Sequence, residues 1–177
     1  IIEFNKADTN NIIMDLRNNG GGYVDVAVDI ASYFLPEGAT VFTEKRGKDK
    51  EETIYKSKGY KLLKNPEKLK LVILVNKNTA SASEILAGAL RDYGIATIIG
   101  EKTFGKGSMQ ELINVTDQMS LKVTVARWYT PKGVSISGTG INPDYSIIAD
   151  ENNTKGGIDP VFDKAIEVIL KGKDSQK

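Results

Sequence analysis

The chain has 177 residues, of which 40% are hydrophobic and 27% are charged, and this is enough to bury one well-formed globular core. Its net charge of +1 argues against a nucleic acid or an anionic membrane surface as a partner. The chain contains no cysteine and no histidine, which excludes disulfides, thiolate nucleophiles and a Ser-His-Asp arrangement. A covalent hydrolase built on this chain must therefore use lysine, a carboxylate or a chain terminus as its base.

The first half of the chain alternates predicted strands with predicted helices. Residues 11–16 (NIIMDL) indicate a buried strand, and the loop RNNGGG leads from it into a helix over residues 23–35. Residues 39–45 and 52–57 flank a polar segment, residues 46–51, and predict a β-hairpin.

The second half contains the clearest βαβ pattern. Residues 69–76 (LKLVILVN) are a continuous apolar run typical of a buried strand, and residues 77–94 predict a helix closed by Gly94. Residues 95–100 predict a second buried strand, so the two strands are expected to pair in parallel. After Lys106 the sequence alternates apolar and polar residues on both sides of a turn, which predicts a second hairpin.

The chain is expected to end in one more helix. Residues 158–171 have Asp159 as the predicted N-cap and Pro160 at the first helical position, and the lysine-rich residues 171–177 are expected to be a frayed tail. The sequence shows no internal repeat, no low-complexity linker and no run long enough to span a membrane. These patterns predict an α/β fold in one domain.

The stretch GEKTFGKGS, residues 100–108, nearly matches the phosphate-binding loop G-x-x-x-x-G-K-[ST]. Gly107 stands where that loop has the Ser or Thr that coordinates magnesium. A phosphate loop must also open a helix whose N-terminal amides complete the anion site, whereas a hairpin is predicted here. The context argues against a nucleotide site, so Lys106 needs another explanation.

The segment NTASASEI, residues 78–85, lies where a buried strand is expected to turn into a helix. Ser81 could present a nucleophilic hydroxyl there, beside backbone N–H groups and the positive end of the helix dipole. Ser81 and Glu84 also have the S-x-x-E spacing of a capping box, and Thr79 and Ser83 could cap as well. On the local sequence, both a nucleophile and a structural cap remain open.

Taken together, five segments resemble those of the carboxyl-terminal processing proteases, also called tail-specific proteases, in order and approximate spacing: DLRNNGGG, VNKNTASASEILAGALRDYG, GEKTFGKGSMQ, VTVARWYTPKG and GINPD. The resemblance runs from about Asn11 to Leu170. It implies a serine endopeptidase with a Ser-Lys dyad that cleaves proteins near their C-terminal tails. Ser81 would be the nucleophile, Lys106 the base, and Gln110 the residue that holds the lysine amine.

The resemblance also implies an oxyanion hole made of backbone N–H groups. These match Ala82 and Gly22, with Gly21 as the alternative in the glycine-rich loop. Where many family members have proline after the two asparagines, this chain has Gly20, which affects the stiffness of the loop but no catalytic group.

The implied scaffold is that of crotonases and Clp-type proteases, a spiral of βαβ units with a mixed sheet and a β-hairpin. We expect residues 1–177 to be a single protease-core domain that is cut short at its N-terminus, with the PDZ domain common in the family lying in a missing part of the chain. The resemblance implies no cofactor, no metal and no nucleic-acid partner. It implies protein or peptide substrates with unstructured C-termini and an extracytoplasmic location, in the cell envelope or secreted.

A lysine can act as a base only when its amine is neutral, which requires an apolar setting that excludes water. The run IATIIG and Phe104 offer such a setting, and Gly105 and Gly107 would let the backbone pack closely around Lys106. The same lysine could instead be a solvated surface residue, Gln110 an exposed polar position, and RNNGGG a flexible turn. Two other functions stay open: a non-catalytic peptide-binding or assembly module on the same fold, and a crotonase-like enzyme acting on a thioester.

Overall fold

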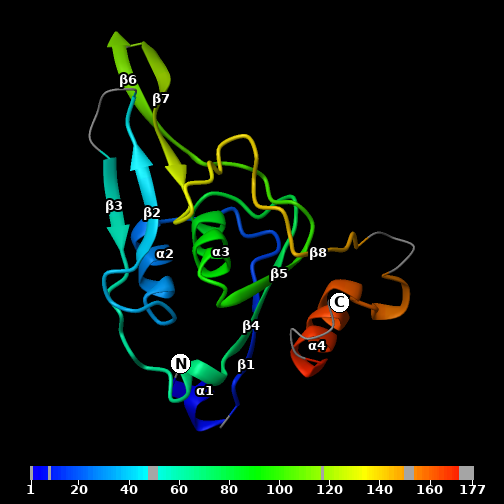
Figure 1. Ribbon diagram of the computed structural model, residues 1–177. Coiled ribbons are helices and arrows are strands. Elements are labelled where there is room, and N and C mark those ends of the chain that lie inside the picture. Colours follow the sequence, from blue (N-terminus) through cyan, green and yellow to red (C-terminus); the bar gives the residue numbers. More distant parts are fainter. Residues whose placement is uncertain (1, 8, 48–51, 117, 150–153, 172–177) are drawn as a thin grey trace.

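In the described part of the chain, the strands form two separate sheets of four, one parallel throughout and one antiparallel throughout (Figure 1). The α/β class predicted from the sequence is confirmed. The structure is a computed structural model. It describes residues 2–7, 9–47, 52–116, 118–149 and 154–171. Most of the predicted polar turn and of the predicted frayed tail lies outside these residues.

The parallel sheet has the strand order β1-β4-β5-β8 and contains the predicted βαβ unit. Its strands are β1 (Asn11–Asp15), β4 (Lys70–Val75), β5 (Ala96–Gly100) and the short β8 (Tyr145–Ser146). β4 pairs in parallel with β1 on one side and with β5 on the other. This central position explains why β4 reads as a continuous apolar run in the sequence.

Helices cover both faces of the parallel sheet. α2 (Val24–Ala31) and α3 (Ala82–Asp92) pack on one face, and α4 (Pro160–Lys171) packs on the other (Figure 1). No helix in the described part of the chain is long and apolar enough to cross a membrane.

The side chains of β4 divide between the two faces because successive residues of a strand point in opposite directions. Leu71, Ile73 and Val75 belong to the core cluster that includes α2 and α3. Val72 and Leu74 belong to a second cluster with α4. The parallel sheet is therefore buried on both faces.

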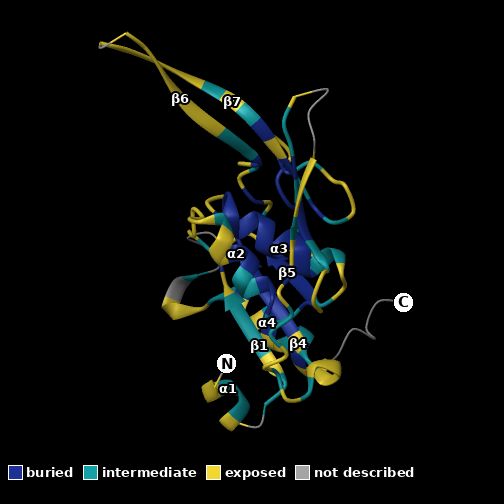
Figure 2. Cartoon of the chain, turned by 90° about the vertical axis from the view of Figure 1, so that its left-hand side faces the viewer, coloured by how far each residue is buried: buried dark blue, intermediate teal, exposed yellow. Residues whose placement is uncertain are grey.

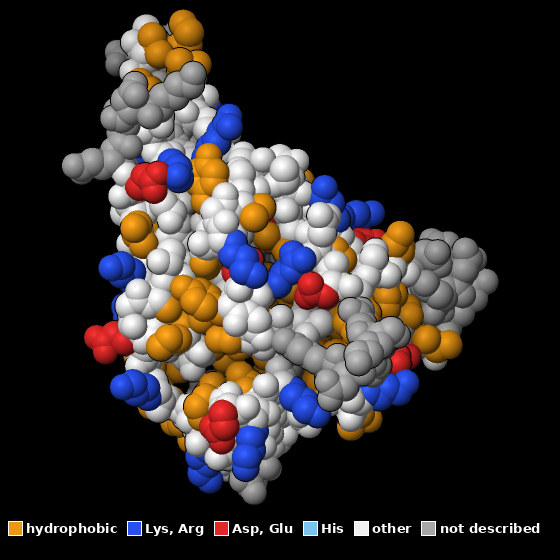
Figure 3. Space-filling view, in the orientation of Figure 1, with side chains coloured by type: hydrophobic (Ala, Val, Ile, Leu, Met, Phe, Trp, Pro, Cys, Tyr) orange, Lys and Arg blue, Asp and Glu red, His pale blue; other side chains and the backbone are white. Residues whose placement is uncertain are grey.

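The antiparallel sheet has the order β3-β2-β7-β6 and contains both predicted hairpins. Its strands are β2 (Thr40–Lys45), β3 (Glu52–Lys56), β6 (Ser108–Thr116) and β7 (Met119–Tyr129). The β6–β7 hairpin projects from the body of the molecule and is largely exposed (Figure 2). Apolar side chains gather at its tip (Figure 3).

α3 lies between the two sheets. Phe42 of β2 and Trp128 of β7 join the same core cluster as the apolar residues of α3, and the first nine residues of this helix are buried. The loop that enters α3 therefore brings Ser81 to a place where both sheets and their loops meet.

Some elements were not predicted from the sequence. These are the short helix α1 (Ile2–Lys6), the single 3-10 turns η1 (Pro66–Lys68) and η2 (Lys155–Gly157), and β8. α2 ends at Ala31, earlier than the predicted helix over residues 23–35. Pro36 explains part of this difference, because a residue before proline disfavours the α conformation.

Candidate active site

The glycine-rich loop after β1 packs directly against Ser81. Gly21 has a φ of +93°, and a Cβ built at this position would lie 2.7 Å from Ser81 Cβ and 2.7 Å from Ala80 O. Only glycine avoids both the strain and the clash. The Ala80 amide also donates to the Asn19 carbonyl oxygen at 3.0 Å. These contacts hold the loop beside the serine.

Side-chain amides join this loop to the loop that follows β4. Asn18 Oδ1 accepts hydrogen bonds from Asn76 Nδ2 and Asn78 Nδ2, each at 2.9 Å. In return, the Asn18 amide donates to Asn76 Oδ1 at 3.0 Å. The two loops lie at the carboxyl ends of neighbouring parallel strands, which is where α/β sheets commonly bind ligands.

The three amides predicted for an oxyanion hole differ in their availability. The Gly21 amide donates to Asn19 Oδ1 at 3.0 Å and is therefore occupied. The Gly22 amide makes no hydrogen bond within the described residues. Ala82 is the first residue of α3, where the helix offers its amide no acceptor. Gly22 and Ala82 thus remain available to bind an oxyanion.

Ser81 has an unusual backbone conformation, with φ of 60° and ψ of −124°, and its residue is only 7% exposed. A positive φ is uncommon for a residue with a side chain, and such positions cluster at functional sites. Glu84 Oε2 accepts the Ser81 amide at 2.9 Å, so the capping-box contact predicted from the S-x-x-E spacing is also present.

Glu84 does more than cap the helix. It is fully buried, and its carboxylate accepts four hydrogen bonds. One oxygen, Oε1, accepts from the Thr103 hydroxyl and from the Gly105 amide, the latter at 2.7 Å. The other, Oε2, accepts from the amides of Ser81 and Lys106, each at 2.9 Å. Because both amides donate to the same oxygen, their nitrogens can be no further apart than the sum of these two distances. Glu84 therefore brings the serine and lysine segments together.

The S-x-x-E spacing in the sequence predicts only the capping role of Glu84. The sequence does contain a sign of a wider role, because Glu84 is a carboxylate within α3, a helix whose other residues are mostly small or apolar. A buried carboxylate must find several donors, and most of those that Glu84 uses lie about 20 residues further along the chain.

The Lys106 loop is fixed by its backbone. Phe104 N donates to Thr79 O at 3.0 Å, and Gly107 O accepts from Trp128 N at 2.8 Å. A Cβ on Gly107 would overlap the backbone of residues 136–137, so the close packing predicted for the flanking glycines is present.

The apolar setting predicted for Lys106 is absent from the described residues. Lys106 is exposed and Phe104 is 68% exposed. Within IATIIG, Ala96, Ile98 and Ile99 are buried in β5 of the parallel sheet, so they do not enclose the lysine. Within the part of the chain that the structure describes, Lys106 makes no ion pair.

Gln110 is the third residue of β6 and is exposed. Among the described residues its side chain makes no hydrogen bond to Lys106. The pairing of β6 with β7 shifts between Met109 and Gln110, because Val125 of β7 is an extra residue in the register. Such a bulge bends the strand locally and is common beside active sites.

A groove of about 260 Å³ lies beside the serine segment, between the glycine-rich loop, α2 and the first turn of α3. Its lining is mostly apolar and consists of Leu16, Asn19, Gly21, Gly22, Tyr23, Val26, Ala27, Ile30, Ala82, Ser83 and Leu86. Gly22 and Ala82, the two residues with available amides, both belong to this lining. The groove can therefore hold an apolar side chain next to a carbonyl group bound by the two amides.

Arg17, at the start of the glycine-rich loop, ties this loop to α4. Its guanidinium contacts both oxygens of Asp159 at 2.8 and 2.9 Å and also pairs with Asp15 at 2.7 Å. Asp159 Oδ1 also caps α4 by accepting the Phe162 amide at 3.0 Å. Burial pushes the pKa of Asp159 up, but this hydrogen bond and the Arg17 guanidinium outweigh burial and hold the pKa below its usual value.

Asp159→Asn should test the ion pair separately from the cap, because asparagine also caps helices well. A lowered carboxyl pKa stabilises the fold above the unfolded value of about 3.9, and this stability is lost as the pH falls through the lower folded pKa. We therefore expect Asp159→Asn to be less stable than the parent by at most about 1 kcal/mol at pH 7, since the pair is partly exposed, and we expect this difference to shrink as the pH falls to 3. Urea unfolding at pH 7 and at pH 3 measures both.

Asp163→Asn is the matched control, since Asp163 lies exposed in the first turn of α4 and makes no side-chain contact in the described part of the chain. If both variants have the same pH dependence, Arg17 does not stabilise the fold through Asp159.

Comparison with known proteins shows the family to which the chain belongs. A protein of Staphylococcus epidermidis named a probable CtpA-like serine protease is 45% identical over 147 residues, and one of Staphylococcus aureus with the same name is 43% identical. These alignments cover 83% of this chain but only 29% of each relative. The chain belongs to peptidase family S41, whose model matches residues 1–147.

A solved structure agrees with this assignment. The photosystem II D1 C-terminal processing protease superposes with a TM-score of 0.72 and 37% identity, over 82% of this chain and 36% of that one. The α/β architecture, with its parallel and antiparallel sheets, is thus that of an S41 protease core.

Proposed function

We propose that this chain is the catalytic core of a serine endopeptidase that cleaves proteins near unstructured C-terminal tails. Family membership and the likeness to a C-terminal processing protease support the reaction class. The observation that carries the proposal is the Glu84 carboxylate, which binds the amides of Ser81 and Lys106 through one oxygen.

In the proposed reaction, the Ser81 hydroxyl attacks the scissile carbonyl and gives its proton to the neutral Lys106 amine. The Gly22 and Ala82 amides bind the oxyanion of the tetrahedral intermediate. Lys106 then returns the proton to the leaving amine, and an acyl-enzyme remains on Ser81. Water, deprotonated by Lys106, attacks the acyl group, and Lys106 then returns this proton to the Ser81 oxygen as the acid is released.

Because Lys106 is exposed, the proposal requires the substrate to shield its amine from water. A peptide chain bound over Phe104 and Lys106 would exclude water from the amine and favour its neutral form. We assign the groove beside Gly22 and Ala82 to the side chain next to the scissile bond, because its lining is apolar. Gln110 keeps its proposed role as the residue that orients the lysine amine once the substrate is bound.

Two features support a peptidase over the alternatives. A non-catalytic binding module has no need of the strained Ser81 backbone or of the free amides beside it. A thioester enzyme would use an oxyanion hole but has no need of a lysine loop tied to the same carboxylate as the serine. The extracytoplasmic location and the unstructured tail as substrate belong to the same proposal.

A serine-directed fluorophosphonate tests the nucleophile in the full-length protein. We expect one adduct per chain, mapped by mass spectrometry to the peptide that contains Ser81, and no adduct in Ser81→Ala. Ser83→Ala is the matched control, since Ser83 is a buried serine in the same helix turn, and it should label like the parent. An unlabelled parent that still cleaves peptides would contradict the assignment of Ser81. An unlabelled protein that cleaves nothing would favour the binding module.

A further inference from the structure

An arginine links two strands of the antiparallel sheet that are not neighbours. Arg46 follows directly after β2, while its guanidinium reaches β6, with β7 lying between the two strands. Its Nη2 lies 3.5 Å from Met109 Sδ, and its Nη1 lies 3.5 Å from Glu111 Oε1. The β7 residue paired with Met109 is Ala126, which has only a small methyl side chain.

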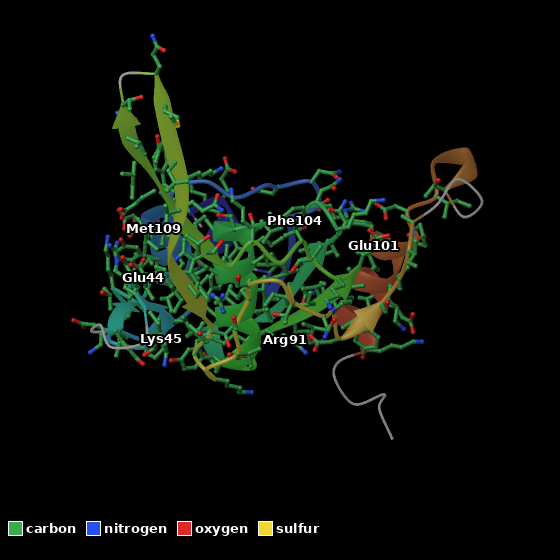
Figure 4. All side chains as sticks on the ribbon, turned by 90° about the horizontal axis from the view of Figure 1, so that it is seen from above. Glu44, Lys45, Arg91, Glu101, Phe104 and Met109 are labelled. Atoms are coloured by element: carbon green, nitrogen blue, oxygen red, sulfur yellow. The ribbon has the colours of Figure 1, made fainter. Side chains whose placement is uncertain are left out.

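A buried carboxylate orients this arginine. Arg46 Nε donates to Glu44 Oε1 at 2.8 Å, and the Glu44 side chain is only 6% exposed. Glu44 and Met109 lie near each other at the base of the hairpin, well apart from Arg91 and Glu101 (Figure 4). Since one partner is buried, the guanidinium is held more firmly than in an ordinary surface ion pair.

The two β6 residues that Arg46 contacts stand on either side of Gln110. Side chains alternate along a strand, so Gln110 points to the face opposite Met109 and Glu111. The pairing of β6 with β7 is also irregular between Met109 and Gln110. A bulge leaves the local backbone with fewer regular ladder contacts, so contacts before and after it decide where Gln110 points.

We propose that Arg46 is a positioning residue that fixes β6, the strand that carries Gln110 and directly follows the Lys106 loop. It acts through Met109 and Glu111 and touches neither the substrate nor the reacting atoms. This inference rests on the proposed function, because it concerns how the proposed base and its orienting residue are held. Glu44 serves as the fixed anchor for the guanidinium.

The test uses Arg46→Met in the full-length enzyme, which keeps most of the length of the side chain and removes its fork of donors. We expect kcat to fall about tenfold with little change in KM, because a misplaced catalytic group slows the chemical step more than it weakens binding. Arg46→Lys should recover only part of the loss, since one ammonium cannot reach Glu44, Met109 and Glu111 together. Glu111→Gln should lower kcat in the same direction.

A double variant, Arg46→Met with Glu111→Gln, separates positioning from independent effects. If the arginine acts through β6, the double variant loses no more than Arg46→Met alone. If instead the losses in kcat of the two single variants multiply in the double variant, Arg46 does not act through Glu111 and the proposed route through β6 is overturned.

Arg91→Met is the control, because Arg91 also pairs with a carboxylate, Asp144, but at the far end of α3. Its kcat should equal that of the parent, and the melting temperature of every variant is measured alongside. Parent-like kcat in Arg46→Met, or a loss equal to that of Arg91→Met, would overturn the inference. Lys106→Arg distinguishes a failure of the proposed catalytic base from a failure of the proposed role of Arg46. An active Lys106→Arg enzyme refutes the proposed base, whereas an inactive one beside a fully active Arg46→Met enzyme refutes only the role of Arg46.

Discussion

Lys106→Arg is expected to slow peptide cleavage about 10²- to 10⁴-fold while the protein stays folded. A guanidinium cannot lose a proton at any usable pH, so arginine at this position cannot accept the proton of Ser81. General-base catalysis contributes roughly 10² to 10⁴ in rate, and we expect a loss in kcat/KM of about this size. Lys106 is exposed, and the loop is held by backbone hydrogen bonds, so the fold has little reason to respond. The measurement is kcat/KM on a peptide substrate, with circular dichroism to follow the fold.

Lys102→Arg is the matched control. Lys102 is an exposed lysine of the same loop and makes no side-chain contact in the described residues. It should keep the kcat/KM of the parent. If Lys106→Arg cleaved the substrate at a rate near that of the parent, the base would have to be sought elsewhere in the chain.

The fold could be predicted from the sequence where local pattern and tertiary position agree. β4 lies between two parallel neighbours, so its burial on both faces appears directly as an apolar run. The β6–β7 hairpin could be predicted because its two strands are neighbours in the sequence and pair with each other. By contrast, β8 has only two residues and forms by pairing with β5, which is far away in the sequence. No local sequence pattern therefore predicts it.

Less of the site than of the fold could be predicted from the sequence. Resemblance to a family assigned roles to Ser81, Lys106 and Gln110, and those roles remain proposals. The expectation that residues close in sequence would shield Lys106 is wrong for the described chain, because strand residues bury their side chains in the sheet rather than around the loop that follows. Whether an amide is free also escapes sequence reasoning. Gly21 and Gly22 look alike in the sequence, yet only Gly21 donates to Asn19.

Glu84→Gln is expected to be the most damaging single change outside the proposed dyad. The carboxylate presents two oxygens to four donors, and three of these are backbone amides. Glutamine keeps one oxygen and turns an NH₂ group toward two of the same donors. Unsatisfied buried donors cost about 1–3 kcal/mol each, so we expect about 3 kcal/mol or more to be lost from the free energy of unfolding. Urea unfolding at pH 7 measures this loss.

The same change should also lower kcat/KM by about 10²-fold per folded molecule, because Glu84 sets the distance between the serine and lysine segments and a shift of about 1 Å has an effect of this size. Glu101→Gln is the control, since among the residues that the structure describes Glu101 accepts only one backbone amide, from Lys77 at 3.3 Å, and the change should affect both quantities little. Activity is normalised to the folded fraction, so unfolding alone cannot imitate the expected result. A Glu84→Gln enzyme that is destabilised yet has the kcat/KM of the parent per folded molecule would show that the carboxylate holds the fold together without placing Ser81 against Lys106.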